Sequence, residues 1–165
     1  MKDRWDELLA VLSNMLSIYQ AILTLSQQKH EILVAAKSHD LEIVTKQEEI
    51  LILQVGKLED QRGKLVSELM ANHGITEGQF SLAELHKIAT PTVVEQLENF
   101  GKEFTDIMTA MVPINKENTD LIKQALGFIN YNINLLSKTV VGPTYAAKGQ
   151  ADKQTIQRTV FDARV

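Results

Sequence analysis

Apolar side chains recur along this chain at alternating spacings of three and four residues, which is the period of one face of an α-helix. The first such stripe starts at Trp5 and passes through the polar residues Ser26 and Lys29 before it reaches Leu33. Two further apolar columns flank the stripe, so the apolar surface covers about 160° of the helix. A helix with so wide an apolar surface needs more than one neighbour.

A second stripe with the same spacing covers residues 41–69. The helix-capping residue types Ser38 and Asp40 precede it, and they predict that a helical hairpin turns at this point. Gly74 follows the stripe, and a glycine in this position is a natural C-terminal cap. The first two stripes therefore predict an antiparallel pair of long helices.

The rest of the patterned chain predicts one short helix and one very long helix. A capping box at residues 81–84 indicates a short helix that ends near residue 89. The third stripe, residues 93–135, keeps its phase through Pro113, whereas a loop would normally reset the phase. We therefore expect one continuous helix over residues 91–138, bent at Pro113 because proline removes a backbone hydrogen bond.

These elements predict an all-α fold. We expect an elongated antiparallel helical hairpin or coiled-coil bundle of three long helices, with one short connecting helix. The bundle domain covers residues 1–141. Residues 142–165 are rich in polar residues and have few apolar anchors, so they predict a weakly structured C-terminal tail that folds on partner binding.

Composition and charge exclude several classes of function. The chain of 165 residues carries 17 basic and 21 acidic side chains, with no basic footprint for nucleic acid. It has no cysteine, which fits a reducing compartment such as the cytoplasm. Residues 8–28 lack charge but contain too many polar side chains for a lipid-facing helix, and the acidic residues before them argue against a signal peptide. We expect a cytoplasmic protein that is not embedded in a membrane.

No catalytic or cofactor-binding constellation is apparent. The four histidines are scattered without the spacing of a helical metal site, so solvent-exposed or capping roles are expected for His30, His39, His73 and His86. Phosphate-binding loops, nucleophile elbows and Cys/His couples are absent from the sequence. We predict a protein that is not an enzyme and uses neither cofactor nor metal.

Four further polar residues interrupt the second and third apolar stripes. Glu48 and Arg62 lie about 21 Å apart on one helix, so each must find a partner on another helix or reach solvent. Long side chains at the edge of the core, or residues that set the helix register, explain them best. Asn118 and Asn132 interrupt the last stripe, where a buried asparagine usually sets register at some cost in stability.

Three short motifs follow one another along the chain. They are Leu58-Glu59-x-x-Arg62, Asn115-x-x-Asn118 and Thr144-Tyr145-x-x-x-Gly149. The order and spacing of these motifs resemble those of the FlgN family of flagellar export chaperones. The resemblance covers the chain from Trp5 to Gly149. The resemblance implies a chaperone that binds the hook–filament junction proteins, also called hook-associated proteins 1 and 3. It would keep them unassembled in the cytoplasm and deliver them to the flagellar type III export gate, without cofactor or chemistry.

The resemblance also implies roles for individual residues. Tyr145 and Gly149 are expected to dock to the cytoplasmic domain of the export gate, although Tyr145 could equally fold back onto the end of the bundle. Leu58, Glu59 and Arg62 form a structural motif. Cargo-binding or helix-register roles are expected for Asn115, Asn118, Leu121, Phe128, Ile156, Val160 and Phe161. An amphipathic helix of the cargo could be sheltered in a groove between the helices.

A second function class remains open. The heptad stripes would serve a structural coiled-coil or scaffold protein, acting by self-association, as well as they serve a chaperone. Apolar flank columns can close a bundle within one chain or between chains. The sequence therefore leaves open whether the protein forms a homo-oligomer.

Overall fold

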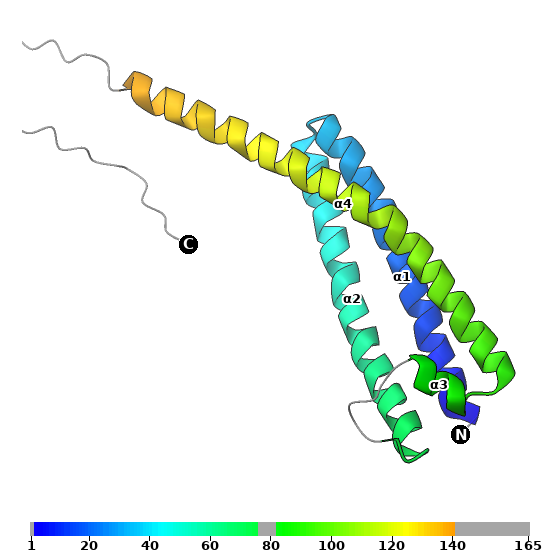
Figure 1. The fold of residues 1–165 in the computed structure, drawn as a ribbon. Coiled ribbons are helices and arrows are strands. Elements are labelled where there is room, and N and C mark those ends of the chain that lie inside the picture. The colour runs from blue at the N-terminus through cyan, green and yellow to red at the C-terminus, as the bar shows by residue number, and fades with distance from the viewer. Residues whose placement is uncertain (1, 76–81, 141–165) are drawn as a thin grey trace, which may run out of the picture. The chain divides into compact units, whose positions relative to one another are not determined.

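A computed structural model of the protein describes residues 2–75 and 82–140, and within them the chain forms helices and no strand (Figure 1). The helices are α1 (Lys2–Val34), α2 (Ser38–Ala71), α3 (Leu82–Ile88) and α4 (Pro91–Val140). This arrangement confirms the predicted all-α fold of three long helices with one short connecting helix.

The chain divides into two compact units, residues 1–127 and 128–165. The first unit holds α1, α2, α3 and α4 as far as Gly127. The described part of the second unit is the C-terminal portion of α4. The predicted tail, residues 142–165, lies outside the described residues.

A tight turn around Ala36 joins α1 to α2. The backbone N–H of Ala36 donates to the carbonyl of Leu33 at 3.2 Å, and that of Lys37 donates to Ile32 at 3.1 Å. This pair of bonds is a Schellman cap, in which Ala36 takes a left-handed φ of 53°. The predicted capping role of Ser38 is wrong, because Lys37 is the N-cap of α2, without a side-chain capping bond. The Schellman cap ends α1 and leads straight into α2, so Ser38 already lies in the first turn.

Gly74 ends α2 as the sequence predicts. It has a left-handed φ of 72°, a conformation that a residue without a Cβ adopts readily. Its N–H donates to Ala71 at 3.1 Å, and the N–H of Ile75 donates to Met70 at 3.1 Å, which is again the Schellman pattern. Ile75 also packs against the buried core, so the cap ties the end of α2 to the bundle.

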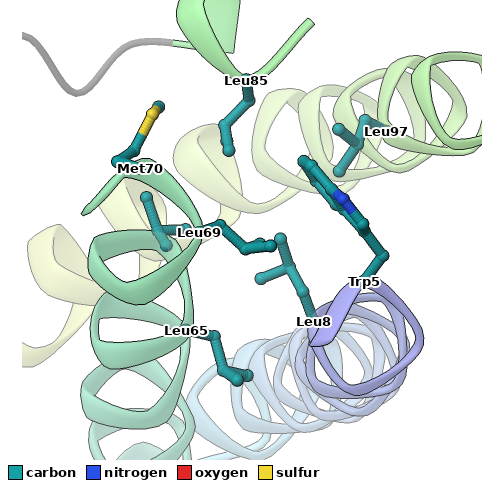
Figure 2. Packing of buried hydrophobic residues seen from close by; sticks show 8 residues of the cluster. Trp5, Leu8, Leu65, Leu69, Met70, Leu85 and Leu97 are labelled. Carbon is teal, nitrogen blue, oxygen red and sulfur yellow. The ribbon is translucent and has the colours of Figure 1, made fainter. Parts of the chain in front are cut away.

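The first hydrophobic cluster takes side chains from all of the helices α1 to α4. Its buried members are Trp5 and Leu8 of α1, Leu65, Val66, Leu69 and Met70 of α2, Leu85 of α3 and Leu97 of α4 (Figure 2). Each fully buried side chain of this size contributes about 1.5–3 kcal/mol relative to an exposed one. The single buried leucine of α3 explains how so short a helix is held against the bundle.

A second cluster packs α1 against α4. Ile22 and Leu23 of α1 are buried with Ile107 and Met111 of α4, and side chains of α2 pack against them. The rings of Tyr19 and Phe104 meet edge to face, with centroids 4.9 Å apart. Since α1 contacts both α2 and α4, the expectation that its wide apolar surface needs more than one neighbour is confirmed.

Helix α1 is also long and apolar enough to cross a membrane, over Arg4–Val34. The core helix of a soluble protein and a signal sequence pass the same test, and 22% of the apolar window of α1 is buried in the structure. Among the described helices no other meets these criteria. The length and composition of α1 are thus weak support for a membrane span.

Helix α4 continues through Pro113, as the phase of its stripe predicts. Proline lacks the N–H that would bond to the carbonyl of Thr109, four residues earlier. Both residues are exposed, so water can hydrate the freed carbonyl. The break in the hydrogen-bond ladder therefore does not leave a buried polar group without a partner.

Candidate functional site

A polar cluster, formed by Ser26, Lys29, His30, Glu48 and Asn118, lies among the apolar side chains of the first unit. Nζ of Lys29 in α1 donates to Oε2 of Glu48 in α2 at 2.6 Å, and the two side chains are only 17% and 10% exposed. The hydroxyl of Ser26, a buried residue, donates to the other carboxylate oxygen of Glu48 at 3.4 Å. Each of these charges is largely withdrawn from water, so loss of either leaves the other uncompensated.

Asn118 connects α4 to this cluster. It is 2% exposed, and its Nδ2 donates to the backbone carbonyl of Ser26 at 2.9 Å. Its Oδ1 therefore faces Nδ1 of His30, 3.1 Å away, and this nitrogen must carry a proton to donate to it. The carboxylate of Glu117 lies 3.8 Å from the same nitrogen. The prediction of a buried asparagine in the last stripe is confirmed for Asn118, whereas Asn132 is only partly buried.

The polar cluster binds three helices to one another in a single register. Its hydrogen bonds run from α1 to α2 and from α1 to α4, so sliding either neighbour by one residue would break them. An adjoining cavity of about 190 Å³ is also lined by Asn115 and Thr119. No group of three His, Cys, Asp or Glu side chains that could hold a metal ion occurs in the described part of the chain. Buried polar residues among apolar ones often set the register of packed helices, and such a role for this cluster stays a prediction.

The second polar interruption, Arg62, forms an ion pair within its own helix. Its Nε donates to Oε2 of Glu59 at 2.8 Å, and its Nη2 bonds to Oε1 of the same carboxylate. These hydrogen bonds lower the pKa of Glu59 and raise the pKa of Arg62. Arg62 reaches solvent, one of the two outcomes expected for it, since its side chain is 37% exposed. Its partner Glu59 lies three residues away on the same helix, where side chains are neighbours. For Glu48 the same expectation is confirmed, since Lys29 belongs to α1.

The second unit carries an apolar face that is open to solvent. Phe128, Ile129 and Ile133 lie on one side of α4, each is at least half exposed, and Phe128 reaches 67%. Large apolar side chains gathered in this way usually mark an interaction surface. Phe128 was predicted as a cargo-binding or register residue, and its exposure leaves its aromatic ring available to a partner.

The other predicted site residues lie in different surroundings. Asn115 and Leu121 of α4 and Leu58 of α2 are partly buried. The predicted gate-docking residues Tyr145 and Gly149 lie outside the described residues. The same holds for the predicted tail residues Ile156, Val160 and Phe161. Hence the structure brings Asn115 and Asn118 to one cavity and places the Arg62 motif on a different helix.

Sequence reasoning missed the partners of Glu48 and Asn118. Ser26 and Lys29 stand in the apolar stripe of α1, and this signal could have paired them with Glu48 across the hairpin. The expectation for histidines holds for His73, whose Nδ1 lies 2.8 Å from the carbonyl of Leu69 at the end of α2. His30 departs from it in part, because its side chain is only 35% exposed and its ring bonds Asn118 of another helix.

Comparison with known proteins gives two matches. The sequence model of the FlgN family, described as FlgN protein, matches residues 1–153. An uncharacterized protein of Bacillus subtilis (strain 168), YvyG, is 27% identical over 119 residues, which is 72% of each chain. No solved structure matches the chain.

Proposed function

Because the chain belongs to the FlgN family, we propose that it carries hook-associated proteins 1 and 3 and keeps them unassembled in the cytoplasm. In the same proposal it delivers them to the cytoplasmic domain of the flagellar export gate. The family is one of flagellar export chaperones that bind flagellar proteins, and it is not a family of enzymes. The choice of these two cargoes is what membership of the family implies.

The exposed apolar face of α4 is the observation that carries the proposal. Phe128, Ile129 and Ile133 lie on one side of α4, and burial of their exposed apolar surface against a partner would be favourable. An amphipathic helix of the cargo can cover such a face with its own apolar side chains, as in helix-in-groove recognition. Covering it would at the same time keep the cargo helix from assembling.

Charge substitutions on this face test the proposal. Ile129→Asp and Ile133→Asp place carboxylates in the middle of the apolar face, and both positions are exposed, so the fold should tolerate them. We expect each variant to bind purified hook-associated proteins 1 and 3 at least tenfold more weakly in calorimetric titrations. Leu53→Asp is the matched control, because Leu53 is a similarly exposed apolar residue on α2. Unchanged binding by both variants would refute cargo binding at this face.

Gate docking has a separate test. Tyr145→Ala should abolish binding to the purified cytoplasmic domain of the export gate and leave cargo binding unchanged, whereas Tyr145→Phe distinguishes the ring from the hydroxyl. A variant that lost cargo binding instead would show that Tyr145 belongs to the cargo surface.

Sedimentation separates this proposal from the scaffold alternative. The same apolar face could be covered by a second copy of the chain. A stable homodimer that ignores both hook-associated proteins would contradict the chaperone proposal. A chain that forms a stoichiometric complex with either cargo supports it.

A further inference from the structure

An apolar pocket of about 210 Å³ opens between the helices of the first unit. Leu12 and Met15 of α1, Val66 of α2 and Phe100 of α4 contribute to its walls. Small-molecule sites usually measure about 300–1,000 Å³, so this pocket is small for a cofactor. Its size and apolar lining fit one or two bulky apolar side chains from another protein.

Gly101 of α4 lines this pocket and is itself exposed, so it lies at the rim. A glycine inside a helix is unfavourable relative to alanine and calls for a reason. Packing within the chain supplies none, because a Cβ at Gly101 would meet no other atom within 4 Å. The same holds for Gly56, Gly63 and Gly127, but of these four helical glycines only Gly101 lines this pocket, where the missing side chain leaves room for a second backbone to approach α4.

Arg62 of α2 is the one charged residue among the described side chains that line the pocket. Glu59 occupies its Nε and Nη2, and within the described residues its Nη1 has no hydrogen-bond partner. A guanidinium held in place by one carboxylate can still bind a second carboxylate through its remaining donors. The rim of the pocket therefore suits an acidic side chain beside an apolar one.

We propose that this pocket is a second cargo contact, which receives an amphipathic helix of the carried protein. A bulky apolar side chain of that helix fills the pocket, its backbone passes over Gly101, and a carboxylate about one turn away binds Nη1 of Arg62. Aromatic, methionine and arginine side chains, of the kind found at protein interfaces, line the contact. The assignment rests on the proposed chaperone function, and it adds a site in the first unit to the apolar face of the second.

Leucine at the rim tests the proposal without opening a cavity. Gly101→Leu fills the approach to the pocket, and leucine favours the helix, so the variant should melt at the same temperature as the wild type or higher. Gly56→Leu is the matched control, because Gly56 is also an exposed helical glycine with nothing within 4 Å of its missing Cβ, and it lies away from the pocket. Arg62→Gln removes the charge and keeps a polar side chain.

Each variant is titrated with purified hook-associated proteins 1 and 3 and with peptides that cover their terminal helices. We expect binding at least tenfold weaker for Gly101→Leu and for Arg62→Gln, and within twofold of wild type for Gly56→Leu. Tryptophan-free peptides should also change the fluorescence of Trp5, which packs in the same cluster as Leu8, Leu85 and Leu97 of the pocket wall. That change should disappear in Gly101→Leu.

These titrations distinguish failure of the pocket assignment from failure of the chaperone proposal. If the wild-type chain binds cargo and Gly101→Leu binds it within twofold, the pocket assignment is wrong and the chaperone proposal stands. A wild-type chain that binds neither protein overturns the chaperone proposal, and the pocket assignment with it. Sedimentation that shows a wild-type dimer lost in Gly101→Leu would mean that a second copy fills the pocket, which also overturns the assignment.

Discussion

Replacing Asn118 with alanine should measure how strongly the polar cluster holds α4 on the bundle. The change removes the 2.9 Å bond to the Ser26 carbonyl and the 3.1 Å bond to His30. Each such bond contributes about 0.5–1.5 kcal/mol net, so the two together contribute about 1–3 kcal/mol. The Ser26 carbonyl lies within α1, and the His30 side chain is 35% exposed and can turn to water. The full desolvation penalty is therefore avoided, and we expect a loss of about 2 kcal/mol.

Urea unfolding, monitored by far-ultraviolet circular dichroism, measures this loss of unfolding free energy from the midpoint of the transition and its dependence on urea concentration. Asn132→Ala is the control, because Asn132 occupies an equivalent place in the stripe of α4 but makes no side-chain hydrogen bond within the described residues. It should change the free energy of unfolding by less than about 0.5 kcal/mol. Equal small losses from Asn118→Ala and Asn132→Ala would refute the idea that Asn118 ties α4 to α1.

Three further changes probe single features in the same urea assay. Ala36→Gly relieves a left-handed φ and should raise the free energy of unfolding by about 1 kcal/mol, whereas a loss would show that no strain exists there. Lys29→Met leaves the buried Glu48 without its partner and should lower the free energy of unfolding by about 3–5 kcal/mol. Adding Glu48→Leu should restore most of that loss, and a double variant no more stable than Lys29→Met would contradict the pairing. The hydrogen bonds with Arg62 lower the pKa of Glu59 in the folded state. The pair therefore stabilises the folded protein at pH values above the ordinary pKa of 4.5, and this stabilisation is lost as the pH falls through the lower pKa of the folded state. Glu59→Gln should therefore flatten the acid-side loss of stability, and an unchanged slope would contradict this.

The long helices could be predicted because their signal is local and repeated. Helical phase persists over nine or more positions in each stripe, so a single exception such as Pro113 does not hide the element. Helix ends depend on a few backbone bonds instead. The sequence pattern predicts the turn near Ser38 and Asp40, whereas the observed turn is at Ala36. The difference arises because this Schellman cap has alanine in the left-handed position, so no glycine marks it in the sequence.

For the candidate site, too, the burial of a residue could be predicted from the sequence, whereas its partners could not. A buried asparagine at position 118 follows from its place in an apolar stripe, and the structure confirms it. Its partners, the Ser26 carbonyl and His30, lie 92 and 88 residues away in sequence, and no local pattern encodes that distance. The pocket beside Gly101 is likewise built from helices that meet only in the folded bundle.

By itself, then, the sequence determined which segments are helical, which faces are apolar and which polar residues interrupt them, because these follow from the helical period alone. Tertiary structure decided which interruption is buried and which is not. Lys29 and Ser26 cross the hairpin to meet Glu48, whereas Arg62 turns to Glu59 one turn away on its own helix. The physical reason is that burial depends on which helices pack together, and a charge withdrawn from water accepts only a partner within hydrogen-bond reach.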